Sequence, residues 1–127
     1  MKIDQAHVLV NDQDAAKAFY TEVLGFEVET DFVSGDFRWL ALRAPGHDAG
    51  ATLVLGRAEG AAVAFQNETH LAGMPAFVLT LTGGREEFEQ IRARGAEVIS
   101  EPQQQEYGGT DALINDTVGN ILCLHQD

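Results

Sequence analysis

An internal repeat constrains the fold of this chain more than any other feature of its sequence. The segments GFEVET (residues 25–30) and GAEVIS (residues 95–100) share the pattern Gly-x-Glu-Val. Each follows a helical pattern, and each helical pattern follows a stretch in which apolar and polar residues alternate. A repeat of this kind predicts two similar units that pack into one domain, which a chain of 127 residues is long enough to form.

The periodicity of apolar residues predicts the order β-α-β-β-β in each half. Asp12 is a suitable N-cap for the first helix, and Gly95 is suited to end the second. In the first half the elements are predicted over residues 5–10, 12–24, 26–32, 36–42 and 51–55. In the second half they are predicted over residues 76–81, 85–94, 96–100, 110–115 and 120–125.

These patterns predict a single α+β domain over residues 1–127. We call residues 1–56 module one, residues 57–74 the connecting segment and residues 75–127 module two. The connecting segment is rich in Gly and Ala, and we expect it to be irregular. Two curved mixed sheets of this kind would enclose a shared cleft between the faces that carry no helix.

Alternation along the strands predicts which side chains face that cleft, because neighbouring strand residues point to opposite sides. In the first strand the helix-facing set is Ala6, Val8 and Val10. The cleft-facing set is then Gln5, His7 and Leu9. In the last strand Leu122 and Leu124 face the helix, so the opposite face carries Ile121, Cys123 and His125. Both faces of the strand with Phe37 and Trp39 contain apolar residues, so its orientation stays open.

Composition and charge narrow the class of function. The net charge is −12, which disfavours nucleic acid and anionic membranes as partners and suits cationic ligands. No apolar run approaches the length of about 18 residues that a membrane span requires. The N-terminal stretch has no apolar core typical of a secretory signal, so we expect a cytoplasmic protein. Cys123 is the only cysteine, which excludes a disulfide within the chain.

Three stretches in the correct order resemble the vicinal oxygen chelate superfamily, also called the glyoxalase/bleomycin resistance protein/extradiol dioxygenase superfamily. VNDQDAAKAFYTEVLGFEV (residues 10–28) resembles its first strand–helix–strand unit, and FEQIRARGAEV (residues 88–98) its second helix. DTVGNILCLHQ (residues 116–126) resembles its closing turn and strand. The resemblance covers nearly the whole chain. It implies a glyoxalase-like fold of two βαβββ modules, and a homodimer that in some members exchanges modules between chains.

The same resemblance implies four positions at which metal-dependent members hold a divalent ion. These positions fall on Gln5, Thr52, Ala76 and Cys123. Both pairs share an offset of 71 residues, since 76 − 5 = 71 and 123 − 52 = 71. Alanine has no donor atom, threonine rarely binds a metal, and a stable site usually takes three or more protein donors. The set therefore predicts a degenerate metal site and no cofactor, with Cys123 in the place of a lost ligand.

Other side chains remain candidates for the cleft. His7 and His125 lie one step along the cleft faces from Gln5 and Cys123, and together with Cys123 they offer an alternative N/S metal site. Trp39 is a candidate to stack on a flat or cationic ligand. Tyr107 precedes two glycines and is a candidate for a mobile rim above the cleft. His47 and His70 are expected in surface loops.

The sequence leaves three functional hypotheses. The favoured one is a small-molecule binding protein of the bleomycin-resistance type, whose ligand is cationic or antibiotic-like. The alternative is a metal-dependent lyase or dioxygenase of the same superfamily with a non-standard ligand set. A structural or regulatory module with no ligand is a third hypothesis, which the sequence neither supports nor excludes. Ligand-contacting residues are predicted among Gln5, His7, Trp39, Thr52, Ala76, Tyr107, Cys123 and His125.

Overall fold

A computed structural model describes residues 1–46 and 50–127 of the chain. His47 lies outside the described residues. Module one contains β1 (Gln5–Val10), α1 (Gln13–Ala18), a short π-helix (Phe19–Val23), β2 (Glu27–Ser34), β3 (Phe37–Arg43) and β4 (Thr52–Arg57). Module two contains β5 (Pro75–Thr80), α3 (Gly84–Ala93), β6 (Glu97–Gln104), β7 (Thr110–Asn115) and β8 (Ile121–Gln126). Between them lies α2 (Ala61–Leu71).

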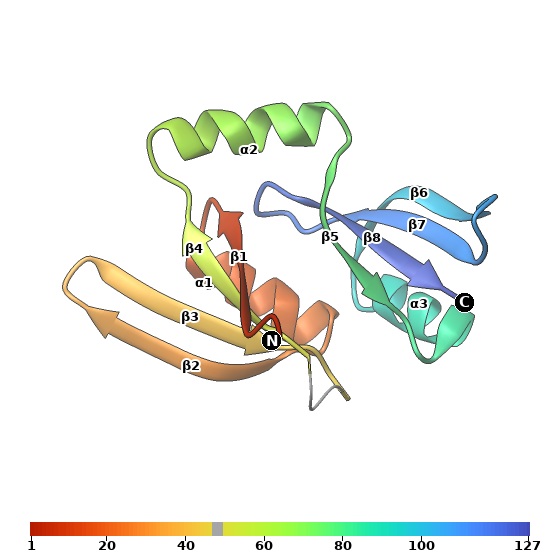
Figure 1. Ribbon diagram of the computed structural model, residues 1–127, viewed down its shortest axis with the longest axis horizontal. Coiled ribbons are helices and arrows are strands. Elements are labelled where there is room, and N and C mark those ends of the chain that lie inside the picture. The colour runs from red at the N-terminus through yellow and green to blue at the C-terminus, as the bar shows by residue number, and fades with distance from the viewer. Residues whose placement is uncertain (47–49) are drawn as a thin grey trace.

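Each module forms one four-stranded mixed sheet, and the two sheets have the same layout (Figure 1). The strand orders are β1-β4-β3-β2 and β5-β8-β7-β6. β1 pairs with β4 in parallel, β5 pairs with β8 in parallel, and the remaining neighbours are antiparallel. The predicted α+β fold with two βαβββ modules is therefore confirmed.

The connecting segment is not irregular as expected, because α2 occupies its middle. Glycines stand at its borders: Gly60 precedes the helix and Gly73 follows it, both with a positive φ. Between them the stretch AAVAFQNETHL holds no glycine or proline, and it begins with alanines, the best helix formers. The glycines that make the connecting segment Gly-rich therefore flank the helix and do not interrupt it. His70, expected in a loop, lies in the last turn of α2.

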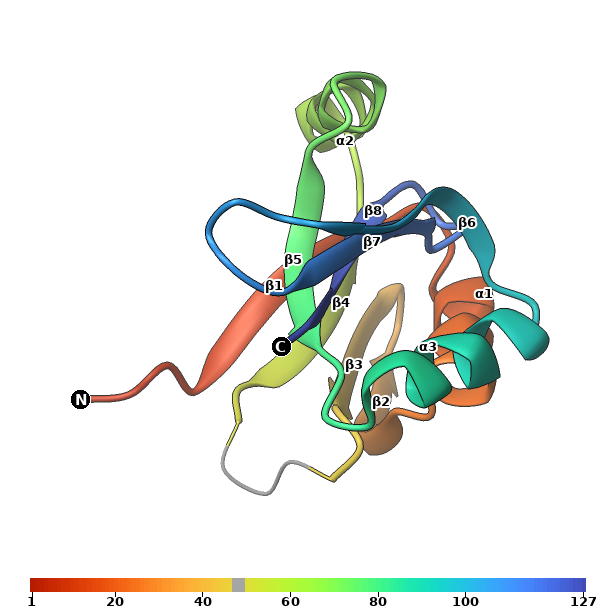
Figure 2. The ribbon, with the colours of Figure 1, turned by 90° about the vertical axis from the view of Figure 1, so that its right-hand side faces the viewer.

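In Figure 2, α1 and α3 both lie at the right of the molecule, and β1, β4, β5 and β8 lie to their left. One apolar core joins both helices to both sheets. Its buried side chains include Val10, Leu42 and Leu55 from module one, and Phe88, Ile114, Leu122 and Leu124 from module two. The face of each sheet that carries no helix, here called its free face, is turned toward the side opposite α1 and α3.

A buried polar network fixes the two modules to each other. Asp116, in the turn before β8, is fully buried and accepts a hydrogen bond from the hydroxyl of Tyr20 at 2.8 Å. The backbone and side-chain amides of Asn120 also donate to Asp116. Asn120 and Gln66 of α2 both donate to the backbone oxygen of Leu9 in β1. Because buried polar groups are costly to leave unpaired, this network holds β1, α2 and the closing turn in one arrangement.

Candidate functional site

The free face of module one carries a cluster of aromatic side chains. Trp39 of β3 pairs directly with Phe32 of β2, and the ring of His7 meets Trp39 edge-on with 5.8 Å between the ring centroids. Phe37 lies two residues before Trp39 on the same strand and therefore on the same face. Phe32 and Phe37 are each 57 % exposed, so this aromatic surface is accessible to a flat ligand.

The orientation of Trp39 follows from its neighbour Arg38, which faces the helix. The guanidinium of Arg38 donates to Asp14 beside the start of α1 and makes two hydrogen bonds to Asp31 of β2. These bonds hold the pKa of Asp31 well below its usual range, and the Arg38 pKa above its own. With Arg38 on the helix side, Trp39 faces the other way, as strand alternation requires. The structure thus places Trp39 on the free face.

Gln5 and Thr52 are neighbours on the free face of module one. They are partners in the parallel pairing of β1 with β4. The hydroxyl of Thr52 donates to the carboxylate of Glu29 at 2.7 Å, and Glu29 also forms an ion pair with Arg43. The Thr52 side chain is therefore committed to a hydrogen bond within its own sheet.

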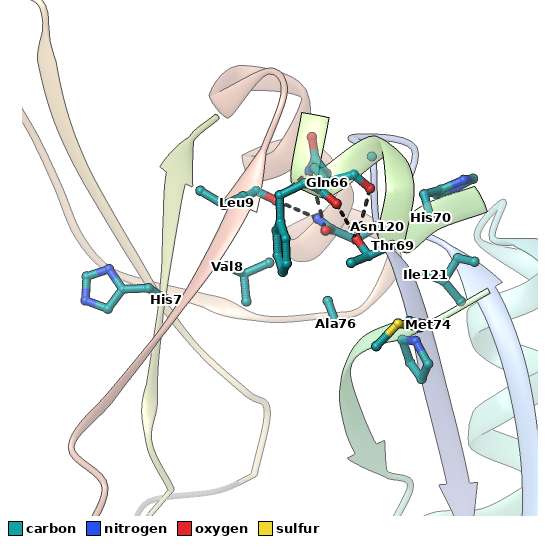
Figure 3. Close-up of a pocket in the computed structure, with 13 residues that line it drawn as sticks. His7, Val8, Leu9, Gln66, Thr69, His70, Met74, Ala76, Asn120 and Ile121 are labelled. Carbon is teal, nitrogen blue, oxygen red and sulfur yellow. Dashed lines mark hydrogen bonds between the residues drawn. The ribbon is translucent and has the colours of Figure 1, made fainter. Parts of the chain in front are cut away.

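Ala76 lies elsewhere, in a pocket of about 240 Å³ beneath α2 (Figure 3). His7, Gln66 and Met74 also line this pocket, although the ring of His7 points away from the other side chains. The shared offset of 71 residues would place Ala76 beside Cys123, as Gln5 lies beside Thr52, but the two modules differ in strand register. The partner of Cys123 is Val78, two residues beyond Ala76.

A hollow of about 640 Å³ lies on the free face of module two. It brings together Tyr107, Cys123 and His125, three of the residues predicted from the sequence. Its lining residues are Pro75, Val78, Ser100, Gln103, Gln105, Tyr107, Asp111, Leu113, Cys123 and His125. Every one of them belongs to module two. The predicted ligand-contacting residues are thus divided among two free faces and the pocket under α2, and within one chain they do not converge.

Asp111 is the central polar residue of the hollow, and it was not among the residues predicted from the sequence. One carboxylate oxygen lies 2.6 Å from Nδ1 of His125, and the other accepts a hydrogen bond from the hydroxyl of Tyr107. The second ring nitrogen of His125, Nε2, lies 3.0 Å from a carboxylate oxygen of Asp127. The hydrogen bond to Asp111 raises the pKa of His125, and Asp127 adds to that effect. Pairing the predicted strands 110–115 and 120–125 could have revealed Asp111, since it lies directly across from His125 in the β7–β8 pairing.

Cys123 is buried and in contact with Asp111. Burial raises the pKa of its thiol, and the negative charge of Asp111 raises it further. A raised pKa disfavours the thiolate, which is the form of cysteine that binds a metal. Among residues 1–46 and 50–127, no group of three or more His, Cys, Asp or Glu side chains is placed to hold a metal ion. The donor chemistry of the four family positions does not fit a divalent ion.

The fold and the two free faces define a two-module glyoxalase-like protein, and comparison with known proteins agrees. The sequence matches the Glyoxalase/Bleomycin resistance protein/Dioxygenase superfamily over residues 2–124, and the chain belongs to that superfamily. It is 34 % identical to the Bacillus subtilis (strain 168) protein YurT over 127 residues, covering 99 % of both chains.

Solved structures resemble it over the whole chain as well. UcmS2 shares 30 % sequence identity with a TM-score of 0.84, and the match covers 98 % of this chain and 97 % of that one. TnmS3, an antibiotic binding protein from Streptomyces sp. CB03234, shares 25 % identity with a TM-score of 0.77, covering 99 % and 95 % of the two chains. Within the part of the chain that the structure describes, no helix is long and apolar enough to cross a membrane.

Proposed function

We propose that this protein binds a small, planar, cationic organic molecule of the antibiotic type between the free face of module one and that of module two. The observation that carries the proposal is the complementary chemistry of these surfaces. Module one offers Trp39 with Phe32 and Phe37, and module two offers an open hollow with Asp111 in its wall. Aromatic rings suit a flat ligand, and a carboxylate beside apolar side chains suits a positive charge.

Charge supports a cationic ligand. The chain carries a net charge of −12. Within the hollow, Asp111 and the nearby Asp127 outnumber His125, which is the only basic residue of its lining. A field of this sign raises the local concentration of cations and opposes anions.

The ligand site is completed by a second copy of the chain. The aromatic surface lies on the module-one sheet and the hollow on the module-two sheet, each on the free face. Two copies that meet through these free faces would place module one of each against module two of the other. A homodimer of this kind has two equivalent clefts.

The surface around α2 supports this association. Residues 60–76 include one acidic residue, Glu68, and no lysine or arginine, on a chain whose net charge would otherwise keep copies apart. Phe65, Leu71 and Met74 are respectively 64 %, 86 % and 57 % exposed there. Exposed apolar patches of this kind mark interaction sites in soluble proteins.

The proposal includes no metal cofactor. Of the four family positions, Ala76 offers no donor, Thr52 is bonded to Glu29, and the thiol of Cys123 has a raised pKa, which disfavours the thiolate. Only Gln5 remains, and a single amide oxygen does not hold a divalent ion. The antibiotic-binding description of TnmS3, which has a similar fold and length, supports a role in ligand capture.

The single tryptophan gives a direct test. Trp39 lies in the proposed cleft, so a bound aromatic compound should quench its fluorescence. The full chain is titrated with bleomycin and with doxorubicin, which both combine planar rings with a positive charge. Saturable quenching, with one ligand per chain by calorimetry, is the expected result. If neither compound binds, or if one binds without any change in Trp39 emission, the proposed site is wrong.

Mixed dimers test the second copy. Trp39→Ala removes the module-one wall, and Asp111→Asn removes the module-two charge, so each variant alone should bind poorly. When the two variants are mixed and allowed to exchange subunits, each mixed dimer regains one intact cleft and binding returns. A cleft formed within one chain would give no recovery after exchange.

A further inference from the structure

We propose that His125, held as an imidazolium, is the positioning residue for the β6–β7 loop (residues 105–109) that forms the rim of the module-two hollow. The rim is closed while His125 carries its proton and opens when the proton is lost. This inference rests on the proposed function, because it concerns access to the same binding site.

The hydrogen bonds of the ring require the charged form. Nδ1 lies 2.6 Å from Asp111 Oδ1, and Nε2 lies 3.0 Å from Asp127 Oδ1. An ionised carboxylate only accepts, so both ring nitrogens must donate, and only the imidazolium can do so. The raised pKa of His125 agrees with this geometry, since the bond to Asp111 is its main cause.

The loop rests directly on this ring. Tyr107 stacks on His125, with 6.4 Å between ring centroids and an interplanar angle of 21°, and its hydroxyl bonds to Asp111. Gly109 passes so close that a Cβ atom there would lie 2.5 Å from His125 Cε1. The loop closes on itself through a hydrogen bond from the Gln105 amide to the Gly109 oxygen, at 2.9 Å. Moving the imidazole therefore requires moving the loop.

Loss of the proton breaks this arrangement. A neutral imidazole donates through one nitrogen, so the other would turn its lone pair toward a carboxylate oxygen. The titratable groups around the ring are Asp111 on β7, Asp127 after β8, Tyr107 in the loop and Cys123 on the same strand. None of these replaces the lost positive charge. The ring must turn or withdraw, and the close contact with Gly109 transmits that movement to the rim.

The direction of the pH effect follows from the sign of the shift. A histidine whose pKa is raised on folding stabilises the folded arrangement below the unfolded pKa of about 6.5, and that contribution is lost as pH rises through the folded pKa. Tyr107 and Gln105 line the hollow, so an open rim frees its entrance. Ligands should accordingly dissociate faster at higher pH.

The test uses NMR of the ligand-free full chain from about pH 5.5 to about pH 8.5, the range in which histidines titrate. We expect both ring nitrogens of His125 to be protonated at low pH, with a midpoint above 6.5. Protection factors of the Gln105 and Gly108 amides should fall by about tenfold with the same midpoint, as loss of a charged hydrogen bond implies.

Two variants keep the proposal falsifiable. His125→Gln should abolish the pH dependence of loop protection, whereas His7→Gln, the matched change on module one, should leave it intact. Loop protection that is independent of pH while His125 titrates, or a His125 midpoint at or below 6.5, would overturn the proposal. Since no ligand is added, this result is separate from the ligand titrations. A protein that binds neither compound can still show the pH-dependent opening of the loop, and a protein that binds one of them can lack it.

Discussion

The hydroxyl of Tyr20 offers a sharp test of how the two modules are held together. Tyr20 is fully buried in module one, and its hydroxyl donates at 2.8 Å to Asp116, which is fully buried in module two. Burial raises the pKa of Tyr20, and the charge of Asp116 raises it further, so the phenol stays protonated and acts as a donor. Tyr20→Phe removes this donor and keeps the ring contacts with Phe19, Phe26 and Phe77.

The expected cost follows from what Asp116 retains. Its Oδ2 atom keeps the bond from the Asn120 side chain, and Oδ1 keeps the backbone amides of Val118 and Asn120. A hydrogen bond to a charged group contributes about 1.5–3 kcal/mol, so Tyr20→Phe should lower the free energy of unfolding by about 2 kcal/mol. Full loss of the carboxylate would cost more, since it would also leave the turn amides without an acceptor.

The assay is urea unfolding at a fixed protein concentration, because the stability of the proposed dimer would depend on that concentration. Tyr107→Phe is the matched control, because the Tyr107 hydroxyl also donates to a carboxylate, that of Asp111. Tyr107 is 73 % exposed, so water can replace the lost donor there. Its free energy of unfolding should change by less than about 0.5 kcal/mol. If the two variants lose the same stability, the Tyr20–Asp116 bond does not join the modules as described.

Further outcomes concern the turn, the pocket and the ligand. Gly119→Ala should lower the free energy of unfolding in urea by more than about 1 kcal/mol. The backbone φ at Gly119 is +104°, and the new Cβ would lie 2.5 Å from Gln66 Cδ. An unchanged free energy of unfolding would contradict that contact. Cys123→Ser should leave both the melting temperature and the calorimetric ligand affinity nearly unchanged, since a hydroxyl also donates to Asp111, and loss of affinity would indicate a role for the thiol. Affinity for a cationic ligand should fall as salt rises, because exposed charges are screened over about 8 Å at physiological ionic strength, whereas a tight anionic ligand would contradict the charge argument.

The repeat and the strand alternation predicted most of the fold, because both depend on local spacing. Val8 and Val10 are buried, and Leu122 and Leu124 lie in the core, as the alternation of side chains along their strands predicted. Ala6 was placed with them but is exposed near the start of β1. The helix α2 was missed for a different reason. Its only buried side chain is Gln66, so the segment has no apolar face that periodicity could detect.

The site was harder to predict, because it depends on register and on packing between distant segments. The partner of Cys123 on β5 is Val78, two residues beyond Ala76, and a constant offset in the sequence cannot reveal such a difference in strand register. Asp111 was overlooked because its importance comes from Tyr107 and His125, which meet only when the hairpin forms. Trp39 was a candidate from the start, but its orientation required the position of Arg38.

The central claim is that a ligand binds between the two free faces without a metal. The most direct measurement is elemental analysis of protein purified without chelator, followed by calorimetric titration with the cationic aromatic compound before and after chelator treatment. We expect no stoichiometric metal and the same affinity in both titrations. Stoichiometric zinc, nickel or iron, lost together with ligand binding after chelation or in Cys123→Ser, would contradict it.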